Sequence, residues 1–353
     1  MGERRSKIGG EEARRADALA RAAALLVLAL AGCVTPRPRA VPVDQPGAPR
    51  IASEATSPAG DPRADRVVAN DAIVVAGDRF SIGTRVVLWD EPPYFDATVR
   101  APRFDADAAA GDKPRFRPGR DGIAGHPDPA SLRAAVDQFV LHFDVCGSSE
   151  RCFRVLHDLR GLSVHFLLDV DGTIYQTLDV REQAWHATKA NARSVGVEIA
   201  NIGAYPIGDA QPLWDWYGVE PGSAVALGER TAGQPVAFVE GEVQGARLVQ
   251  AEFTPAQEDA LVKLAAGLSR ALPCIRVDAP RGPDGRVKDA ALSSAEFDAF
   301  QGILGHFHVQ TNKVDPGPAF PWDEFLERVR VERAAQIDAQ VDAGGIEAGA
   351  SAR

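Results

Sequence analysis

Residues 137–143 read Asp-Gln-Phe-Val-Leu-His-Phe, a run of bulky, β-prone side chains that reaches a histidine near its end. Such an apolar run predicts a strand buried in the core of a domain. Farther along the chain, residues 163–176 have the pattern of a β-hairpin, with Gly172 at the turn position that needs a positive φ. Residues 194–199 predict another buried strand.

Helices are predicted between these strands and after them. The stretch 149–160 fits a helix, and Thr254 begins a Thr-Pro-Ala-Gln capping box that is followed by leucines at helical spacing. Further helices are predicted near residues 294–300 and from Pro321 onward. Strands that alternate with helices predict the α/β class, a single domain with a central mixed β-sheet flanked by helices.

The composition divides the chain into segments. Residues 66–130 join a small β-rich lead-in, expected to pack against the main domain, to a surface segment rich in Pro, Gly, Asp and Arg. The main domain is predicted over residues 131–330, with a Trp-, Pro- and Gly-rich insertion over residues 203–250. The end of the chain, residues 331–353, is rich in Ala, Gln, Asp and Gly and predicts a disordered tail.

The N-terminus has the pattern of a lipoprotein signal. An arginine-rich start precedes an apolar run over residues 23–30 that is too short to span a bilayer. The run leads into Leu30-Ala31-Gly32-Cys33, which resembles a lipobox, so residues 1–32 are predicted to be removed and Cys33 to carry lipid. An ordinary secretory signal with a chance cysteine is the alternative. Residues 33–65 then form a proline-rich, disordered tether, and Val34 favours the periplasmic face of the outer membrane.

The charge of the chain bears on its partners. Its formal net charge is −10 at pH 7, and Lys and Arg form no block beyond the N-terminus. Binding to nucleic acid needs a concentrated positive surface, so we expect no nucleic-acid partner. We expect a monomer.

The histidines are unevenly distributed. Six of the seven lie between residues 142 and 308, most of them at the ends of predicted strands, which suggests a site for metal binding or proton transfer. A hydrolytic zinc needs three protein ligands and one open position, and His142, His306 and Asp315 could supply two imidazoles and a carboxylate. Asp315 precedes Pro316, which stiffens the loop, although an aspartate that caps a turn would have the same local pattern.

Five motifs occur in order along the chain. They are Val140-Leu141-His142-Phe143, residues 163–176, Ala184-Trp185-His186-Ala187, residues 194–201, and Gly305-His306 followed by residues 313–320. Together they resemble the type 2 N-acetylmuramoyl-L-alanine amidases, the family of the AmpD enzymes, phage T7 lysozyme and the peptidoglycan recognition proteins. The resemblance covers about residues 137–330, and the lipobox adds similarity to the outer-membrane lipoprotein members.

The resemblance implies an enzyme that hydrolyses the amide between N-acetylmuramic acid and L-alanine in peptidoglycan or muropeptides. It implies Zn²⁺ ligation by His142, His306 and Asp315, with a zinc-bound water as nucleophile. Glu198 is implied as the general base, and Lys313 as the group that stabilises the developing oxyanion.

The same resemblance bears on the surroundings of the metal. We expect the substrate to contact a set of side chains that comprises His165, Trp185, His186, Asn201 and His308. For His165, Trp185 and His186, a place in the core is the alternative. His308 lies two residues after His306, so along a strand both would face the same way and either could reach the metal. Cys146 and Cys152 form a close pair that export would allow to oxidise, and the pair is similar to a disulfide of the recognition proteins, so we expect a disulfide there.

Two other functions fit the same residues. A noncatalytic peptidoglycan-binding protein on the same fold is the main alternative, and an amidase-like enzyme that acts on a different amide is the other. All three predicted ligand positions carry side chains able to bind a metal, and Glu198 and Lys313 accompany them. This combination favours catalysis.

Overall fold

The computed structural model describes residues 70–350, apart from 105–106, 112, 122, 124–126, 220–227 and 231–233. The predicted signal peptide, Cys33 and the tether over residues 33–65 lie outside the described residues. Among the helices of the described part, none combines the length and the hydropathy that crossing a bilayer requires.

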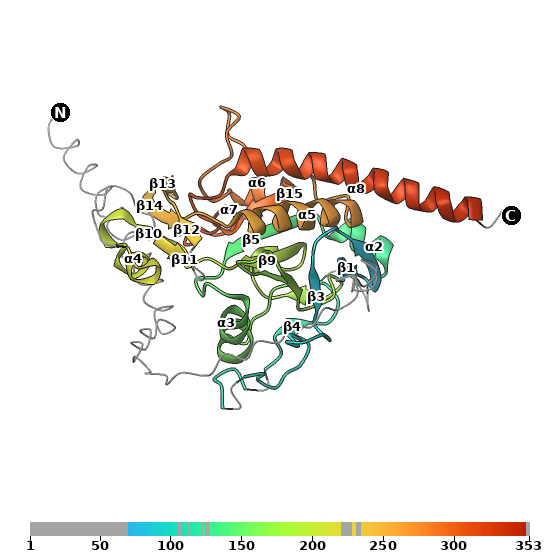
Figure 1. Cartoon of the computed structure of the whole chain (residues 1–353), viewed down its shortest axis with the longest axis horizontal. Helices are drawn as coiled ribbons and strands as arrows, with labels where there is room; N and C mark the ends of the chain where they lie inside the picture. Colours follow the sequence, from blue (N-terminus) through green and yellow to red (C-terminus); the bar gives the residue numbers. More distant parts are fainter. Residues whose placement is uncertain are drawn as a thin grey trace, which may run out of the picture.

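A six-stranded sheet forms the centre of the domain (Figure 1). All neighbouring strands in it are parallel except β6 and β7, which pair antiparallel as a hairpin. The sheet is therefore mixed, as the sequence predicts. In spatial order its strands are β15 (Gly302–Gly305), β5 (Gln138–Phe143), β9 (Ser194–Ile199), β6 (Phe166–Leu168), β7 (Ile174–Gln176) and β3 (Val86–Leu88).

The predicted strands and their hairpin turn are confirmed. Every residue of β5 is buried, which explains why its sequence is an almost continuous apolar run. Gly172 has φ 84° in the β6–β7 turn, and a Cβ there would lie 2.7 Å from the carbonyl oxygen of Ala256. Only glycine fits this close approach between the hairpin and the helix that begins at Pro255.

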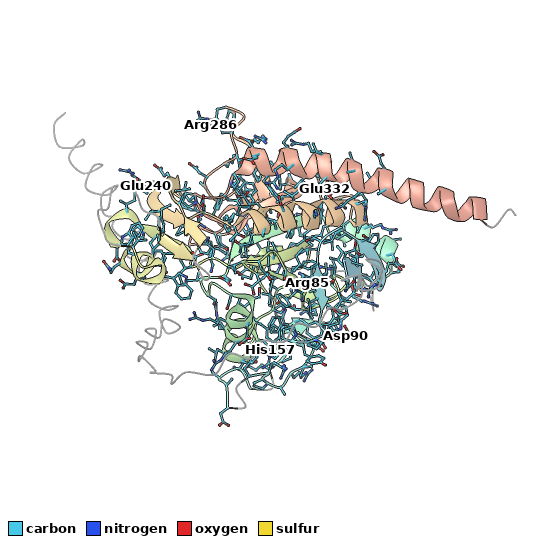
Figure 2. All side chains as sticks on the ribbon, in the orientation of Figure 1. Arg85, Asp90, His157, Glu240, Arg286 and Glu332 are labelled. Carbon is cyan, nitrogen blue, oxygen red and sulfur yellow. The ribbon has the colours of Figure 1, made fainter. Side chains whose placement is uncertain are left out.

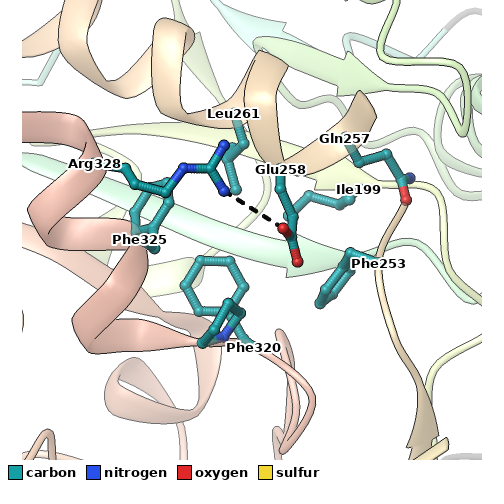
Figure 3. A pocket seen from close by; sticks show the side chains of 9 residues that line it. Ile199, Phe253, Gln257, Glu258, Leu261, Phe320, Phe325 and Arg328 are labelled. Carbon is teal, nitrogen blue, oxygen red and sulfur yellow. Dashed lines mark hydrogen bonds and ion pairs between the residues drawn. The ribbon is translucent and has the colours of Figure 1, made fainter. Parts of the chain in front are cut away.

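Two helices, α5 (Pro255–Ala271) and α8 (Trp322–Ala350), lie side by side over one face of the sheet (Figure 1). The capping box at Thr254 is present, with Gln257 as its return partner. Figure 3 shows a small space between the two helices, where Arg328 pairs with Glu258 over three phenylalanines. Its volume of about 10 Å³ is room for about one water, so this space is a gap in the packing and not a binding site.

Shorter helices complete the domain. The helix predicted over residues 149–160 is confirmed as α3 (Ser149–Phe153), which continues in π-helical form over Arg154–Arg160. The helix predicted near residue 294 is α6 (Ser294–Ala299), and α2 (Pro129–Ala135) precedes β5. A single turn, α7 (His306–Val309), follows β15, and 3₁₀ turns lie at Thr188–Ala190 and Ile207–Asp209.

The β-rich lead-in is part of the main core. Its strands β1 (Ala72–Val75) and β2 (Asp78–Ser81) form an antiparallel pair, whereas β3 joins the central sheet beside β7. The side chain of Gln176 on β7 bonds both the N–H and the carbonyl of Val74. These contacts explain why the lead-in packs so closely against the domain.

The surface segment predicted after the lead-in, within residues 66–130, is wrong in part, because two of its arginines are buried. The Arg120 guanidinium donates to the carbonyls of Val180 and Ser194, and Arg115 donates to that of His157. Burial is tolerable because backbone carbonyls satisfy the guanidinium donors. The segment also contributes β4 (Phe116–Arg117), which pairs with β8 (Gln183–Ala184).

The structure also differs from the predicted disordered tail over residues 331–353, because α8 extends to Ala350. This segment lacks a clear apolar period, yet its Ala, Glu, Gln and Arg residues have high helix propensity. The helix is anchored by Gln336, whose amide donates to the carbonyls of Ile82 and Lys263.

The insertion predicted over residues 203–250 is folded. Three of its strands form an antiparallel sheet, and Tyr205, Leu213 and Tyr217 belong to its own apolar core. In Figure 1 this sheet lies beyond the carboxyl end of β5. The elements of the insertion are β10 (Ala204–Pro206), α4 (Gln211–Tyr217), β11 (Gly228–Arg230), β12 (Gln234–Val236), β13 (Phe238–Val243) and β14 (Ala246–Ala251).

Candidate metal centre and its pocket

The fold brings the three predicted metal ligands together. His142 lies near the end of β5, and His306 directly follows β15, the parallel neighbour of β5. The Nδ1 atoms of His142 and His306 are 2.9 Å apart, and each lies 2.9 Å from Oδ2 of Asp315. All three side chains are buried.

This arrangement fits a divalent ion such as zinc. Bonds from zinc to imidazole nitrogen and carboxylate oxygen are about 2.0–2.2 Å long, so one ion can contact three donors that are 2.9 Å apart. The outer nitrogen of His306, Nε2, lies 2.7 Å from the Gln310 side-chain oxygen and therefore carries the proton. The lone pair of His306 Nδ1 then points at the other two donors, as metal ligation requires.

The charges of the three groups also suit a metal. Burial, followed by the charge of His306, lowers the pKa of His142 to about 4, which keeps this ring neutral. Burial alone would raise the pKa of Asp315, but His306 and the hydrogen bonds from both rings outweigh it and hold this pKa well below its usual range. Two imidazoles beside one carboxylate are a typical donor set of a catalytic zinc.

Glu198 and Lys313 lie at the same site. Glu198 on β9 is the register partner of His142 on β5, and both line one pocket together with Lys313. Burial raises the pKa of Glu198 well above its usual value, and the charges of Asp315 and Asp144 add to this effect. A carboxyl group with a raised pKa is suited to proton transfer near neutral pH.

The pocket has a volume of about 160 Å³. Its floor is the His–His–Asp cluster, and Trp185 and His186 line it together with Arg160. Another wall comes from the insertion, through residues 203–206, Ala246 and Leu248. The pocket thus joins a charged, metal-competent floor to a largely apolar wall.

Of the five predicted substrate contacts, Trp185 and His186 line this pocket. His186 is also bonded to the cluster, because its Nδ1 lies 2.9 Å from His142 Nε2 and its Nε2 lies 3.2 Å from Ser194 Oγ. A Cβ on Gly196 would lie 2.5 Å from His186 Nδ1, so the ring rests on the bare backbone. His186 therefore orients a predicted ligand as well as facing the pocket, a role that its sequence motif does not reveal.

The other three predicted substrate contacts, His165, Asn201 and His308, do not line this pocket, because their side chains are buried and bonded inside the protein. Asn201 is held by the carbonyl of Ala251 and the N–H of Gly203. His308 is bonded to Gly305 N–H and to the carbonyl of Lys288, and burial lowers its pKa to about 3.

The expectation that His308 faces the same way as His306 fails for a geometric reason. It assumed a strand, but the two residues lie on the helical turn α7. Two positions along an α-helix differ by about 200° in direction, so the rings point to opposite sides. Between these two residues, the structure leaves only His306 at the metal centre.

His165 shows what a structural histidine looks like in this fold. Its Nδ1 accepts from Gly196 N–H and its Nε2 donates to the carbonyl of Glu182. Burial, together with the charge of Arg120, lowers the pKa of His165 to about 3. His157, labelled in Figure 2, is a second case, since it bonds Asp158 and the carbonyl of Val99 and lies outside the pocket.

We expect His165 to make the metal-free protein sensitive to acid. Its pKa is about 3 when folded against an ordinary value of 6.5, so the unfolded chain takes up a proton first as pH falls. The contribution of the neutral His165 ring to stability is therefore fully present above about pH 6.5 and is lost progressively as the pH falls toward 3. The free energy of unfolding, measured in urea at pH 6 and pH 4, should fall less in His165→Gln than in the native protein. The difference should be up to about 1.4 kcal/mol per pH unit. An unchanged slope would contradict this expectation.

The predicted disulfide is not seen in the structure, where Cys146 and Cys152 are free thiols buried beside the pocket. Burial raises the pKa of the Cys152 thiol well above its usual value, and a hydrogen bond with Cys146 contributes. Oxidation proceeds through the thiolate, which these surroundings disfavour. Cys274 is also free and is partly exposed.

Asp144 is a buried carboxyl group at the site that the sequence did not reveal. Its Oδ1 accepts three backbone N–H groups, from Cys146, Gly147 and Asn201. Burial raises its pKa to about 7. Asp144 shapes the loop after His142, and its position two residues beyond that ligand is the only signal in the sequence that points to it.

Together, the fold and the site define a class: an α/β domain whose parallel strands end at a buried His–His–Asp cluster in a pocket. A sequence profile described as N-acetylmuramoyl-L-alanine amidase matches residues 132–318, more than half of the chain. The chain belongs to this family, and the resemblance seen in the sequence is confirmed. No curated protein sequence matches the chain.

Several solved structures are similar to the chain. A selenomethionine derivative of AmpD has 18% identity and a TM-score of 0.31, over 61% of this chain and 90% of that one. The endolysin amidase LysCS from Clostridium intestinale URNW has 15% identity and a TM-score of 0.29, over 56% and 86%. The Drosophila peptidoglycan recognition protein SA has 14% identity and a TM-score of 0.27, over 55% and 79%.

Proposed function

We propose that the protein is a zinc-dependent N-acetylmuramoyl-L-alanine amidase that hydrolyses the amide between the lactyl group of N-acetylmuramic acid and L-alanine in peptidoglycan. The observation that carries the proposal is the convergence of His142, His306 and Asp315, with donor atoms 2.9 Å apart, at the floor of a pocket. Family membership supports the class of reaction.

When bound, zinc supplies the Lewis acidity that makes water a nucleophile near neutral pH. His142, His306 and Asp315 would hold the ion, and the protonated Nε2 of His306 on Gln310 keeps that ring in the right tautomer. Glu198 takes the proton from the attacking water and returns it to the leaving amine of L-alanine. Lys313 places its positive charge beside the carbonyl oxygen, where negative charge develops.

The remaining pocket residues suit a muropeptide. Trp185 offers an aromatic face for a sugar ring, and apolar side chains of the insertion, such as Leu248, can contact the lactyl and alanine methyl groups. Arg160 supplies positive charge for a carboxylate of the stem peptide. A noncatalytic binding protein would not need Glu198 beside an intact ligand set, and this observation favours catalysis.

The proposal is tested by incubating the purified protein with soluble muropeptides, with and without a chelator. We expect release of peptides that begin with L-alanine, loss of this activity with the chelator, and its return on addition of zinc. Binding without release would favour the noncatalytic alternative. Release of other products would favour an amidase with a different substrate.

Lys313 provides a prediction about the oxyanion. Lys313→Met should lower kcat about a hundredfold, because one charged donor is lost where the negative charge develops, while the metal content stays unchanged. Lys263→Met is the matched control, since Lys263 lies on α5 outside the pocket and its side chain bonds the carbonyl of Gly83. Equal kcat values for the two variants, measured on muropeptides, would remove Lys313 from the proposed chemistry.

We also propose that Cys33 carries a lipid that anchors the enzyme at the periplasmic face of the outer membrane. The support is the Leu30-Ala31-Gly32-Cys33 sequence after an apolar run, with Val34 next. Cys33→Ser should move the protein from the membrane fraction to the soluble fraction of the envelope in a Gram-negative host. Membrane retention of this variant would argue against the anchor.

A further inference from the structure

The turn of the β13–β14 hairpin lies against the loop that carries two predicted ligands. Gln244 and Gly245 at this turn have φ angles of 56° and 73°. Two successive positive φ values are typical of a tight hairpin turn, where Asn, Asp or Gly usually comes first. A glutamine held in this conformation is strained, which suggests that its side chain has a use that outweighs the strain.

The Gln244 side chain reaches into the ligand loop, here defined as residues 306–319. Its Nε2 donates to the carbonyls of Phe307 at 3.0 Å and Gln310 at 2.9 Å, and the carbonyl of Lys313 lies 3.3 Å away. Its Oε1 accepts from the N–H of Ala291 at 3.2 Å. The Gln244 side chain therefore contacts carbonyls at both ends of the segment that leads from His306 to Lys313.

Gln250 makes a second connection, from β14 to the other end of the ligand loop. This side chain is fully buried, donates to the carbonyl of Pro316 at 2.9 Å and accepts from Ala319 N–H at 3.0 Å. A Cβ on Gly317 would lie 2.1 Å from Gln250 Oε1, so the loop approaches the glutamine as closely as glycine allows. Asp315 lies directly before this contact.

We infer that Gln244 and Gln250 are positioning residues, through which the insertion holds the ligand loop in its metal-binding geometry. The inference rests on the proposed function for its reference to zinc. It gives the insertion a structural role in the metal site, besides its role as a wall of the pocket.

The ligand loop depends on these two glutamines because it has few other hydrogen bonds to hold it in place. In the part of the chain that the structure describes, no strand pairs with the loop between α7 and α8, and its own backbone bonds include Phe307 N–H to the Asp315 carbonyl and Lys313 N–H to that of Gln310. A metal site needs its donors held within about 0.5 Å, which a loop with few backbone bonds does not provide. Amide side chains that bond loop carbonyls supply the missing rigidity, as hydrogen-bond partners do around other metal sites.

The test uses Gln244→Gly, because glycine removes the side chain and also relieves the positive φ of the turn. If Gln244 serves only the hairpin, this variant is as stable as the native protein or more so, and the ligand loop is unaffected. If it positions the loop, amides of residues 306–315 exchange with deuterium at least about tenfold faster in the metal-free protein. The zinc dissociation constant, measured by chelator competition, should then rise about 10- to 100-fold.

Two further variants complete the experiment. Gln244→Glu keeps the size of the side chain but replaces its donors by oxygens that face carbonyls, so it should loosen the loop as well. Gln211→Ala is the matched control, because Gln211 belongs to the same insertion and its side chain bonds Asp215 at the surface. Native exchange rates and native zinc affinity in Gln244→Gly and Gln244→Glu would overturn the inference.

The outcomes separate this inference from the proposed function. If the native protein binds no zinc, the proposed function fails, while exchange in the metal-free protein still reports on the loop. If the native protein binds zinc and all variants bind it equally well, with unchanged exchange, the function stands and the positioning role fails.

Discussion

Glu198→Gln is expected to lower kcat for muropeptide hydrolysis about a thousandfold, within the range of about 10²–10⁴ that a general base contributes. The amide keeps the size of the side chain but cannot accept the proton of the attacking water. Glu198 lies opposite His142 on the neighbouring strand without being one of the three clustered donors, so the metal content should stay that of the native protein.

The pKa of Glu198 supports this role. Its burial and the negative charges of Asp315 and Asp144 raise the pKa, and a bound cation acts in the opposite direction. A bound cation would therefore offset part of this rise in the pKa, and a carboxyl group whose pKa is raised can both take and return a proton. Glu240→Gln, at an exposed position of β13 labelled in Figure 2, is the matched control and should leave kcat unchanged. A Glu198→Gln enzyme with native kcat would exclude this carboxylate as the base.

Asp315→Ala should remove both metal and activity. Asp315 is the only carboxylate in the cluster, and its Oδ2 lies 2.9 Å from each imidazole. Its loss takes away one of three donors and the negative charge that offsets a divalent cation. We expect zinc affinity to fall by more than the roughly 10- to 100-fold that loss of an outer partner of a ligand costs.

The measurement is the zinc content of the purified variant after dialysis, together with its rate on muropeptides. Asp209→Ala, at an exposed 3₁₀ turn of the insertion, controls for the loss of an aspartate. Native zinc content in Asp315→Ala would refute the assignment of this ligand. Loss of activity with native zinc content would assign Asp315 to catalysis and not to ligation.

Local patterns predicted most of the fold correctly. The capping box at Thr254 determines where α5 begins, and the apolar run of β5 identifies a buried central strand, because both signals depend on residues close together in the chain. The disordered tail predicted from the Ala, Gln, Asp and Gly composition of residues 331–353 differs from the structure up to Ala350, because residues of high helix propensity carry α8 to that point.

For the site, the sequence predicts the clustered ligands but not all of the residues around them. The ligand set is predicted from the ordered motifs, because no local spacing links His142 to Asp315. In the fold, the parallel pairing of β5 and β15 places His142 near His306, and Asp315 joins the same cluster. The sequence could not reveal the burial of Arg120, which depends on carbonyls far along the chain. It also placed His308 on a strand where the chain forms a helical turn.

The roles of His186 and Gln244 were hidden for a related reason. Each acts through a bond to a residue that is distant in the sequence, His186 to His142 and Gln244 to the carbonyls of the ligand loop. A histidine in a motif and a glutamine in a hairpin turn have many other uses. Only the folded chain distinguishes among these uses.

The most direct measurement is an X-ray anomalous difference map, recorded at the zinc edge from crystals of the protein grown with zinc. One strong peak is expected at about 2.0–2.2 Å from His142 Nδ1, His306 Nδ1 and Asp315 Oδ2. A map with no peak at these three atoms, or with its zinc held by other side chains, would contradict the metal centre on which the proposed hydrolysis depends.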